Sequence, residues 1–201
     1  MASQQIVIVN TGCANISSVK FAVERLGKQV IVSDDIQVIQ AADKVFLPGV
    51  GSANAAMASI EKKQLISCIR DLTQPVLGIC LGMQLMVEKS AESLGDNTPC
   101  LSLMPGQVKR MQVGDLRLPH MGWNTVTAIG NAPLFKGIDT NSYFYFVHSF
   151  AVAVSDLTMA SCHYGMDFSA AIHKHNFFGV QFHPERSSDA GAQLLRNFID
   201  L

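Results

Sequence analysis

The stretch Pro75-Val76-Leu77-Gly78-Ile79-Cys80-Leu81-Gly82-Met83-Gln84 places a cysteine between two contrasting patterns. An apolar run typical of a buried strand precedes Cys80, and the residues after it have the apolar spacing of a helix. A nucleophile at such a strand-to-helix turn is the cysteine counterpart of the G-x-S-x-G nucleophile elbow. We therefore interpret Cys80 as a candidate nucleophile at a strained turn, with the flanking glycines keeping the turn tight and the substrate's approach free.

The helix that follows Cys80 is predicted to continue to Ser93, with Gly95 beyond its end. Its amino end carries the positive end of the helix dipole, which favours a thiolate over a thiol. The rest of the chain must then supply a base for this sulfur.

The remainder of the chain alternates apolar strand-like runs with segments of helical periodicity, so it predicts a mostly parallel sheet with helices on both faces. Between 97 and 140 the pattern changes to turns and short strands, which indicates a small antiparallel sheet. The predicted strands are 5–9, 29–32, 44–47, 75–79, 143–148, 159–164, 170–173 and 178–182. The other predicted helices are 19–26, 36–42, 53–60, 64–72 and 190–198.

These elements predict a flavodoxin-like α/β fold. We find no linker, repeat or low-complexity segment, so residues 1–201 are expected to form a single domain. With 48% hydrophobic and 15% charged residues, the chain has either a rich core or a surface covered by a partner, and composition does not choose between them. The net charge of -1 gives no indication of nucleic-acid binding.

The sequence predicts a cytoplasmic protein. No apolar run approaches the roughly 18 residues of a membrane span, and the first residues lack the basic region of a signal peptide. The five cysteines are odd in number and show no C-x-x-C spacing, so free thiols in a reducing compartment are expected.

A glycine-rich loop, Pro48-Gly49-Val50-Gly51-Ser52, follows the third predicted strand. Ligands bind at the carboxyl ends of parallel strands, and a glycine loop there can present backbone N–H groups to an oxyanion or to a phosphate. The phosphate alternative is weaker because the loop lacks the third glycine and the Lys-Ser/Thr pair of a P-loop. An ordinary strand-to-helix turn is the third interpretation.

His183-Pro184-Glu185 ends the last predicted strand. If that strand is parallel to the strand before Cys80, His183 lies at the same edge of the sheet and can act as its base. Glu185 can then orient the imidazole, as in a catalytic triad. A lone histidine is more often structural, but the two motifs in one chain favour catalysis.

Together, Gly78–Gln84 and Gly179–Glu185 resemble the motifs of the class I (triad) glutamine amidotransferases. The segments 119–124 (PHMGWN), 145–149 (YFVHS) and 48–51 (PGVG) resemble, within that class, the glutaminase subunits of imidazole glycerol phosphate synthase. The resemblance extends over essentially the whole chain. It departs at 10–15, where many family members have an acidic residue and more glycine, so interface details there are in doubt.

The resemblance implies that Cys80 attacks the side-chain amide of glutamine and forms a thioester, with His183 as proton shuttle and Glu185 as its orienting group. It assigns Val50, Gly51 and Leu81 to the oxyanion hole and Gln84, Glu92, Tyr145 and Ser149 to substrate binding. The ammonium of glutamine needs an anionic partner, which suits Glu92. The alternative for Glu92 is a solvated carboxylate at a helix end.

The resemblance also implies a partner and no cofactor or metal. Ammonia would pass to a (β/α)₈ cyclase subunit, a separate chain in a heterodimer, which makes imidazole glycerol phosphate for histidine biosynthesis. Trp123, in an expected glycine-containing turn, and Arg186 are the interface candidates, against a buried tryptophan and a solvated arginine. The 48–52 loop would hold one peptide in an inactive orientation until the cyclase binds its nucleotide ligand.

Two other functions remain open from the sequence. One is a class I glutaminase serving a different synthase, or another cysteine hydrolase; Trp123 and its motif argue against it. The other is a non-enzymatic flavodoxin-like binding protein, which would leave Cys80, His183 and Glu185 without a common purpose.

Overall fold

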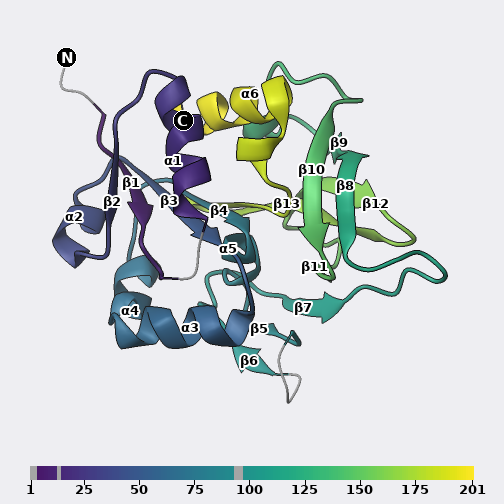
Figure 1. Ribbon diagram of the computed structural model, residues 1–201, viewed down its shortest axis with the longest axis horizontal. Coiled ribbons are helices and arrows are strands. Elements are labelled where there is room, and N and C mark those ends of the chain that lie inside the picture. Colours follow the sequence, from purple (N-terminus) through teal and green to yellow (C-terminus); the bar gives the residue numbers. More distant parts are fainter. Residues whose placement is uncertain (1–3, 13–14, 93–96) are drawn as a thin grey trace.

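A computed structural model describes residues 4–12, 15–92 and 97–201. Its centre is an eight-stranded sheet in the order β2-β1-β3-β4-β14-β13-β12-β9 (Figure 1). The first five strands pair in parallel, and their order is that of a flavodoxin-like fold. In sheet order the strands are β2 Val30–Ser33, β1 Ile6–Val9, β3 Lys44–Gly49, β4 Val76–Cys80, β14 Phe177–Val180, β13 Asp167–Lys174, β12 Thr158–His163 and β9 Thr127–Ala128. The predicted fold class is confirmed.

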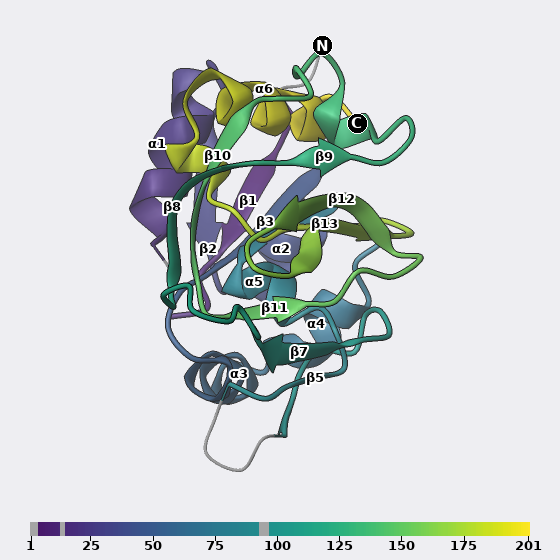
Figure 2. The same cartoon turned by 90° about the vertical axis from the view of Figure 1, so that its right-hand side faces the viewer.

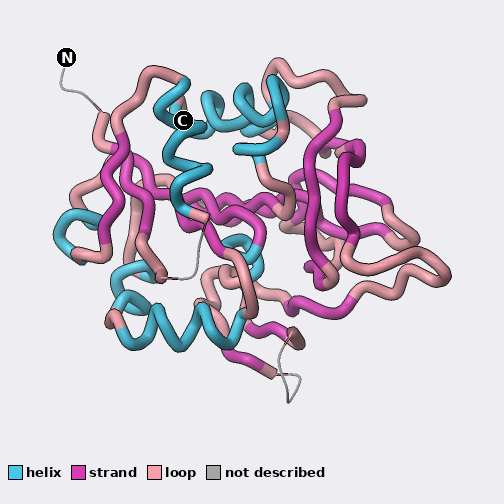
Figure 3. The backbone as a smooth tube through the Cα atoms, viewed as in Figure 1, coloured by secondary structure: helices cyan, strands magenta, loops and turns pink. Residues whose placement is uncertain are grey.

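Helices cover both faces of this sheet (Figure 3). Strand β1 is buried on both faces, so its alternate residues enter two different cores. Ile6 and Ile8 pack in the core that contains the apolar residues of α1 and α6, whereas Val7 and Val9 pack in the core of α2, α3 and α4. The helices are α1 Ile16–Arg25, α2 Ile36–Gln40, α3 Ala53–Lys62, α4 Leu65–Arg70 and α6 Ser188–Ile199.

Two smaller sheets lie beside the main one (Figure 2). Strands β10 (Tyr143–His148) and β8 (His120–Thr125) form an antiparallel pair. The other sheet has the order β11-β7-β5-β6 and includes one parallel pair, β5 with β7. Its strands are β11 Phe150–Val152, β7 Gln107–Arg110, β5 Lys89–Ser90 and β6 Thr98–Pro99. The predicted small sheet is therefore two small sheets.

The helix after Cys80 is much shorter than predicted. Helix α5 spans only Leu81–Gln84; predicted residues Ser93 and Gly95 lie outside the described part of the chain. The carbonyls of Leu85 and Val87 accept hydrogen bonds from the backbone N–H groups of Leu101 and Ser102, at 2.9 and 3.1 Å. Because a neighbouring segment takes these carbonyls, they are not available to continue the helix.

Two other predictions are corrected. Strand β14 ends at Val180, so residues 181–183 lie beyond its ladder and lead into a 3₁₀ turn, η2, at Pro184–Arg186. Trp123 lies in strand β8 and not in a turn, paired with Tyr145 of β10.

In the part of the chain that the structure describes, no helix has the length and apolar character needed to cross a membrane. A further 3₁₀ turn, η1, spans Pro133–Phe135.

Candidate active site

Cys80 is the strained residue of the strand-to-helix turn. It is the last residue of β4 and the N-cap of α5, with φ +54° and ψ −112°. A non-glycine residue in such a conformation costs about 1–3 kcal/mol, which the surrounding packing must offset. The turn lifts the thiol off the end of the sheet, as in a nucleophile elbow.

The flanking glycines keep the turn tight, as predicted, but they do so by allowing close backbone packing and not by leaving room for a substrate. A Cβ on Gly82 would lie 1.8 Å from the carbonyl oxygen of Leu47, and a Cβ on Gly78 would lie 2.8 Å from the backbone of Gly82. A Cβ on Gly49 would also lie 2.8 Å from the Gly82 nitrogen. The glycines therefore let α5 pack directly on β3 and β4, which fixes the turn, and Gly78 and Gly82 do not line the pocket.

His183 stands at the same edge of the sheet as Cys80. Strand β14 pairs in parallel with β4, with Val180 opposite Ile79, so both strands deliver their next residues to one edge. The backbone of His183 is fixed because its N–H donates to the carbonyl of Tyr145 at 2.8 Å and its carbonyl accepts from the hydroxyl of Ser187 at 2.6 Å. The parallel pairing expected from the sequence is confirmed.

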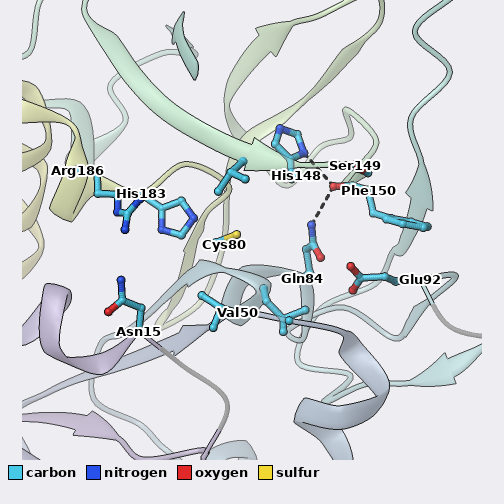
Figure 4. Close-up of a pocket in the computed structure, with 13 residues that line it drawn as sticks. Asn15, Val50, Cys80, Gln84, Glu92, His148, Ser149, Phe150, His183 and Arg186 are labelled. Carbon is cyan, nitrogen blue, oxygen red and sulfur yellow. Dashed lines mark hydrogen bonds between the residues drawn. The ribbon is translucent and has the colours of Figure 1, made fainter. Parts of the chain in front are cut away.

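Glu185 orients the His183 imidazole. Its Oε1 lies 2.8 Å from His183 Nδ1, and its side chain is only 1% exposed. The Nδ1–H therefore donates to the carboxylate, and Nε2 is left facing Cys80 (Figure 4). Among the described residues Nε2 has no hydrogen-bond partner, so it is free to exchange a proton with the thiol or a substrate.

Burial alone lowers the pKa of His183, but a Cys80 thiolate and the Glu185 carboxylate outweigh it and raise the pKa to about 10. Two anionic neighbours favour the imidazolium over the neutral ring. His183 is therefore held as an imidazolium at neutral pH, with a proton available on Nε2.

The triad opens into a pocket of about 270 Å³ (Figure 4). Cys80, Gln84 and His183 point into it from β4, α5 and the segment after β14. The predicted residues that line the pocket are Val50, Gly51, Cys80, Leu81, Gln84, Glu92, Ser149, His183 and Arg186. Segments far apart in the sequence therefore meet at one site.

Glu92 is a partly buried carboxylate at the far end of the pocket from His183. Its Oε2 accepts from the backbone N–H of Ala53, the first residue of α3, at 3.1 Å. Burial raises the pKa of Glu92, partly offset by this hydrogen bond. The alternative of a solvated helix-end carboxylate is therefore wrong, since Glu92 lies beyond β5 and faces the cavity.

The candidate oxyanion residues line the same pocket as Cys80. Val50 and Gly51 follow β3, which pairs with β4 so that Gly49 lies opposite Cys80. Gly51 has φ +92°, a conformation in which other residues are strained. Leu81, the first residue of α5, follows the nucleophile directly.

Of the three remaining predicted residues, Arg186 lines the pocket, whereas Tyr145 and Trp123 do not. Tyr145 is absent from the pocket lining; its ring packs edge-on against Trp123, with centroids 6.0 Å apart. The guanidinium of Arg186 lies 5.9 Å from the centre of the Tyr145 ring. Trp123, which is 52% exposed, thus begins a surface strip that reaches the pocket through Tyr145 and Arg186.

Several polar residues of the site were not predicted. Gln181 is fully buried, and its Nε2 lies 3.8 Å from Cys80 Sγ. His148 lines the pocket and contacts the buried His120 at 3.0 Å. Asn15 also lines the pocket. The signal for Gln181 and His148 was a polar residue within or just after an otherwise apolar strand.

The other described cysteines are buried, and burial disfavours their thiolates. Burial raises the pKa of Cys100 to about 11 and that of Cys162 to about 12, and it also raises that of Cys68. They suit the predicted role of small apolar side chains. Cys13 lies outside the described residues. No cluster of His, Cys, Asp or Glu suited to a metal ion occurs within the described residues.

The fold and the Cys–His–Glu site define a class of protein. The sequence matches the family "Glutamine amidotransferase class-I" over residues 7–201. The chain therefore belongs to the class-I glutamine amidotransferase family. Among solved structures, a glutamine amidotransferase (15% identity, TM-score 0.74, covering 96% of this chain and 97% of that one) and PurLQS from Thermotoga maritima (18%, 0.69, 98% of both) share the fold.

Much closer relatives identify the group within the family. The chain is 56% identical over 204 residues to imidazole glycerol phosphate synthase subunit HisH 1 of Vibrio vulnificus, with both chains fully covered. It is 56% identical over 195 residues to subunit HisH of Haemophilus influenzae, covering 97% of this chain and 96% of that one. Within the class-I family, the chain belongs with these imidazole glycerol phosphate synthase HisH subunits.

Proposed function

We propose that this chain hydrolyses glutamine to glutamate and ammonia through a thioester on Cys80 and passes the ammonia to a cyclase subunit for histidine biosynthesis. The observation that carries the proposal is the buried Glu185–His183 pair, whose Nε2 faces a strained cysteine in a pocket. The identity to the HisH relatives supports the choice of synthase.

The proposed reaction begins when Cys80 Sγ attacks the side-chain carbonyl carbon of glutamine, with the thiol proton held on His183 Nε2. Backbone N–H groups of the Val50–Gly51 loop and Leu81 stabilise the oxyanion. As the carbon–nitrogen bond breaks, His183 returns the proton to the leaving ammonia, which leaves a thioester. His183 then takes a proton from the water that attacks the thioester. The carbon–sulfur bond breaks with its electron pair returning to Cys80 Sγ, so glutamate leaves and the thiolate is regenerated beside the protonated His183.

Substrate binding is proposed for the far end of the pocket. The partly buried Glu92 carboxylate supplies the anion that the glutamine ammonium needs. Gln84 and the Ser149 backbone hold the same amino-acid end, and Tyr145 closes the rim from β10. The whole of residues 1–201 acts as one domain in this proposal.

The proposed partner is a (β/α)₈ cyclase, held as a heterodimer over the strip of Trp123, Tyr145 and Arg186. Exposed Met121 (66%) and Trp123 (52%) lie on the same face of β8, because side chains alternate along a strand. A large exposed apolar surface beside an active site favours a protein partner. The cyclase would use the ammonia to convert a ribulosyl aminoimidazole carboxamide nucleotide into imidazole glycerol phosphate and an aminoimidazole carboxamide ribotide.

The test is glutamate release by the chain alone, with the cyclase, and with the cyclase plus its nucleotide ligand. We expect little activity alone and the highest activity in the third case, because the 48–52 loop is proposed to need the loaded partner. Strong activity alone, or none in the loaded complex, would contradict the proposal. Cys80→Ala is the control: it should abolish glutamate release while the complex still makes product from ammonium salts.

A further inference from the structure

Gln181 approaches the nucleophile from inside the protein. It lies directly after β14, is 0% exposed, and its Nε2 is 3.8 Å from Cys80 Sγ. A buried amide facing a sulfur can present either a donor, which stabilises a thiolate, or an acceptor, which repels one. Its orientation therefore bears directly on the ionisation of Cys80.

The orientation of Gln181 is fixed by Gln84. The side-chain nitrogen of Gln84 lies 2.9 Å from the carbonyl of Phe150, which only accepts, so the atom that faces this carbonyl must be Nε2. The same Nε2 lies 2.9 Å from Gln181 Oε1 and donates its second hydrogen there. With Oε1 of Gln181 occupied, its Nε2 must point toward Cys80.

The Phe150 carbonyl is held from a second side by His148. His148 Nδ1 lies 3.0 Å from this carbonyl and must donate, so in the neutral ring Nε2 accepts. It accepts from His120 Nδ1 at 3.0 Å, and His120 Nε2 in turn accepts from Asn124 Nδ2 at 3.3 Å. Asn124 Nδ2 is itself identified by its bond to the His163 carbonyl, at 2.9 Å. Each group has one donor–acceptor assignment.

We propose that Gln181 is the hydrogen-bond donor that stabilises the Cys80 thiolate, and that Gln84 fixes the direction in which it donates. The inference rests on the proposed role of Cys80 as nucleophile. The thiolate then has two hydrogen-bond donors. The His183 imidazolium can transfer a proton to it, whereas the neutral Gln181 amide stabilises the negative charge without transferring a proton. The donor acts again when the thioester breaks down, because the carbon–sulfur bond then cleaves and its electron pair returns to the sulfur.

The test measures alkylation of Cys80 by iodoacetamide between pH 5 and 10, followed by peptide mass spectrometry. This reaction reports the thiolate and needs neither glutamine nor the partner. For Gln181→Met, which keeps the length of the side chain, we expect alkylation on the acidic side of the profile's midpoint to be about tenfold slower, as for loss of one hydrogen bond to a charged group. The pH profile should shift upward by about one unit, with the plateau rate at high pH unchanged.

Asn176→Leu is the matched control. Among the described residues, its side-chain amide bonds only to the backbone carbonyls of Leu72 and Gln74, at 2.8 and 2.9 Å, at the opposite end of β14. It should reduce stability and leave the Cys80 profile unchanged. A Gln181→Met profile that matches the unsubstituted chain, or a shift of equal size in Asn176→Leu, would overturn the inference.

Gln84→Met tests how the direction is set. With Gln84 unable to donate, the Gln181 amide can turn, so alkylation should slow by a smaller factor than in Gln181→Met. In the double variant Gln84→Met should add nothing, because the donor is already gone. Additive effects would overturn the role of Gln84. If the profiles shift as expected but no complex releases glutamate, the proposed function fails independently of the donor role.

Discussion

Glu185 Oε1 lies 2.8 Å from His183 Nδ1, and the carboxylate is almost completely buried behind the imidazole. Burying a carboxylate with a single partner costs free energy, and the second oxygen of Glu185 has no hydrogen-bond partner among the described residues. Its consequence is a fixed tautomer, with Nε2 directed at Cys80.

Glu185→Gln should lower the glutaminase kcat strongly while KM changes little. The amide keeps the shape of the side chain but removes the negative charge that favours the imidazolium, and it can present an N–H to Nδ1 and so reverse the tautomer. A loss of roughly 10²–10⁴-fold is expected, as for a triad acid replaced by its amide. The measurement is glutamate release in the loaded complex. A loss below fivefold would show that Glu185 does not orient the base.

His183 should remain protonated well above neutral pH. Its pKa is raised to about 10 in the folded protein, against 6.5 ordinarily. Its contribution to the free energy of unfolding is therefore fully present below pH 6.5 and is lost as the pH rises to about 10. Nitrogen NMR of the histidine side chains checks this: His183 should show an imidazolium at pH 8, and the signal of a neutral ring at that pH would contradict the prediction.

Gly82→Ala should destabilise the fold because the new methyl group would lie 1.8 Å from the Leu47 carbonyl oxygen. Backbone atoms of β3 and α5 must separate, so a loss of about 3 kcal/mol or more in the free energy of unfolding is expected.

Gly114→Ala is the control, since Gly114 has φ +60° and nothing within 4 Å of an added Cβ. It should lose only about 1–2 kcal/mol from the unfavourable backbone conformation. Denaturant unfolding of both variants gives the comparison, and equal losses would show that the close approach of α5 to β3 is not what requires glycine.

The sequence was most informative where one local pattern sets a residue's place. The parallel strands, the elbow at Cys80 and the His183–Glu185 pair follow from apolar runs and short motifs. Tertiary contacts decided the rest. Helix α5 stops at Gln84 because residues 101–103 bond to the carbonyls of residues 85–87, an effect no local pattern contains. Gln181 was missed because its proposed role depends on a contact with Gln84, which lies far from it in the sequence.

Trp123→Ala should weaken binding of the cyclase by roughly 30-fold or more, the loss typical of an exposed aromatic anchor. Trp123 is 52% exposed and packs on Tyr145 beside the pocket rim. Phe21→Ala is the matched control: Phe21 is 56% exposed but lies on α1, outside the strip of Trp123, Tyr145 and Arg186. Titration calorimetry with the cyclase measures both. Equal weakening of cyclase binding in both variants, or no weakening in Trp123→Ala, would show that the interface lies elsewhere.

The buried pair of His120 and His148 should make the protein sensitive to acid. Burial lowers the pKa of His120 to about 4. Burial also lowers the pKa of His148 to about 4; the hydrogen bond to the Phe150 carbonyl opposes this shift, and the charges of His120 and His183 add to it. Between pH 6.5 and about 4 the unfolded chain binds protons that the folded chain does not, so stability falls as the pH falls through this range. For the largely buried His148 this amounts to about 3 kcal/mol.

This acid sensitivity follows from the hydrogen bonds that link His148, His120 and Asn124, in which each group has a fixed donor or acceptor role. A proton on His148 Nε2 would face the donating Nδ1 of His120, so protonation breaks the contact that links β8 to β10. His120→Phe should lower the proton uptake on unfolding near pH 5 by about one, because one depressed site is removed. His175→Asn, at an exposed loop position with φ +56°, should leave it unchanged. Denaturant unfolding at several pH values measures the uptake. Equal uptake in His120→Phe and the unsubstituted chain would mean that His120 is already charged in the folded protein, which would contradict the neutral chain on which the orientation of His148 depends.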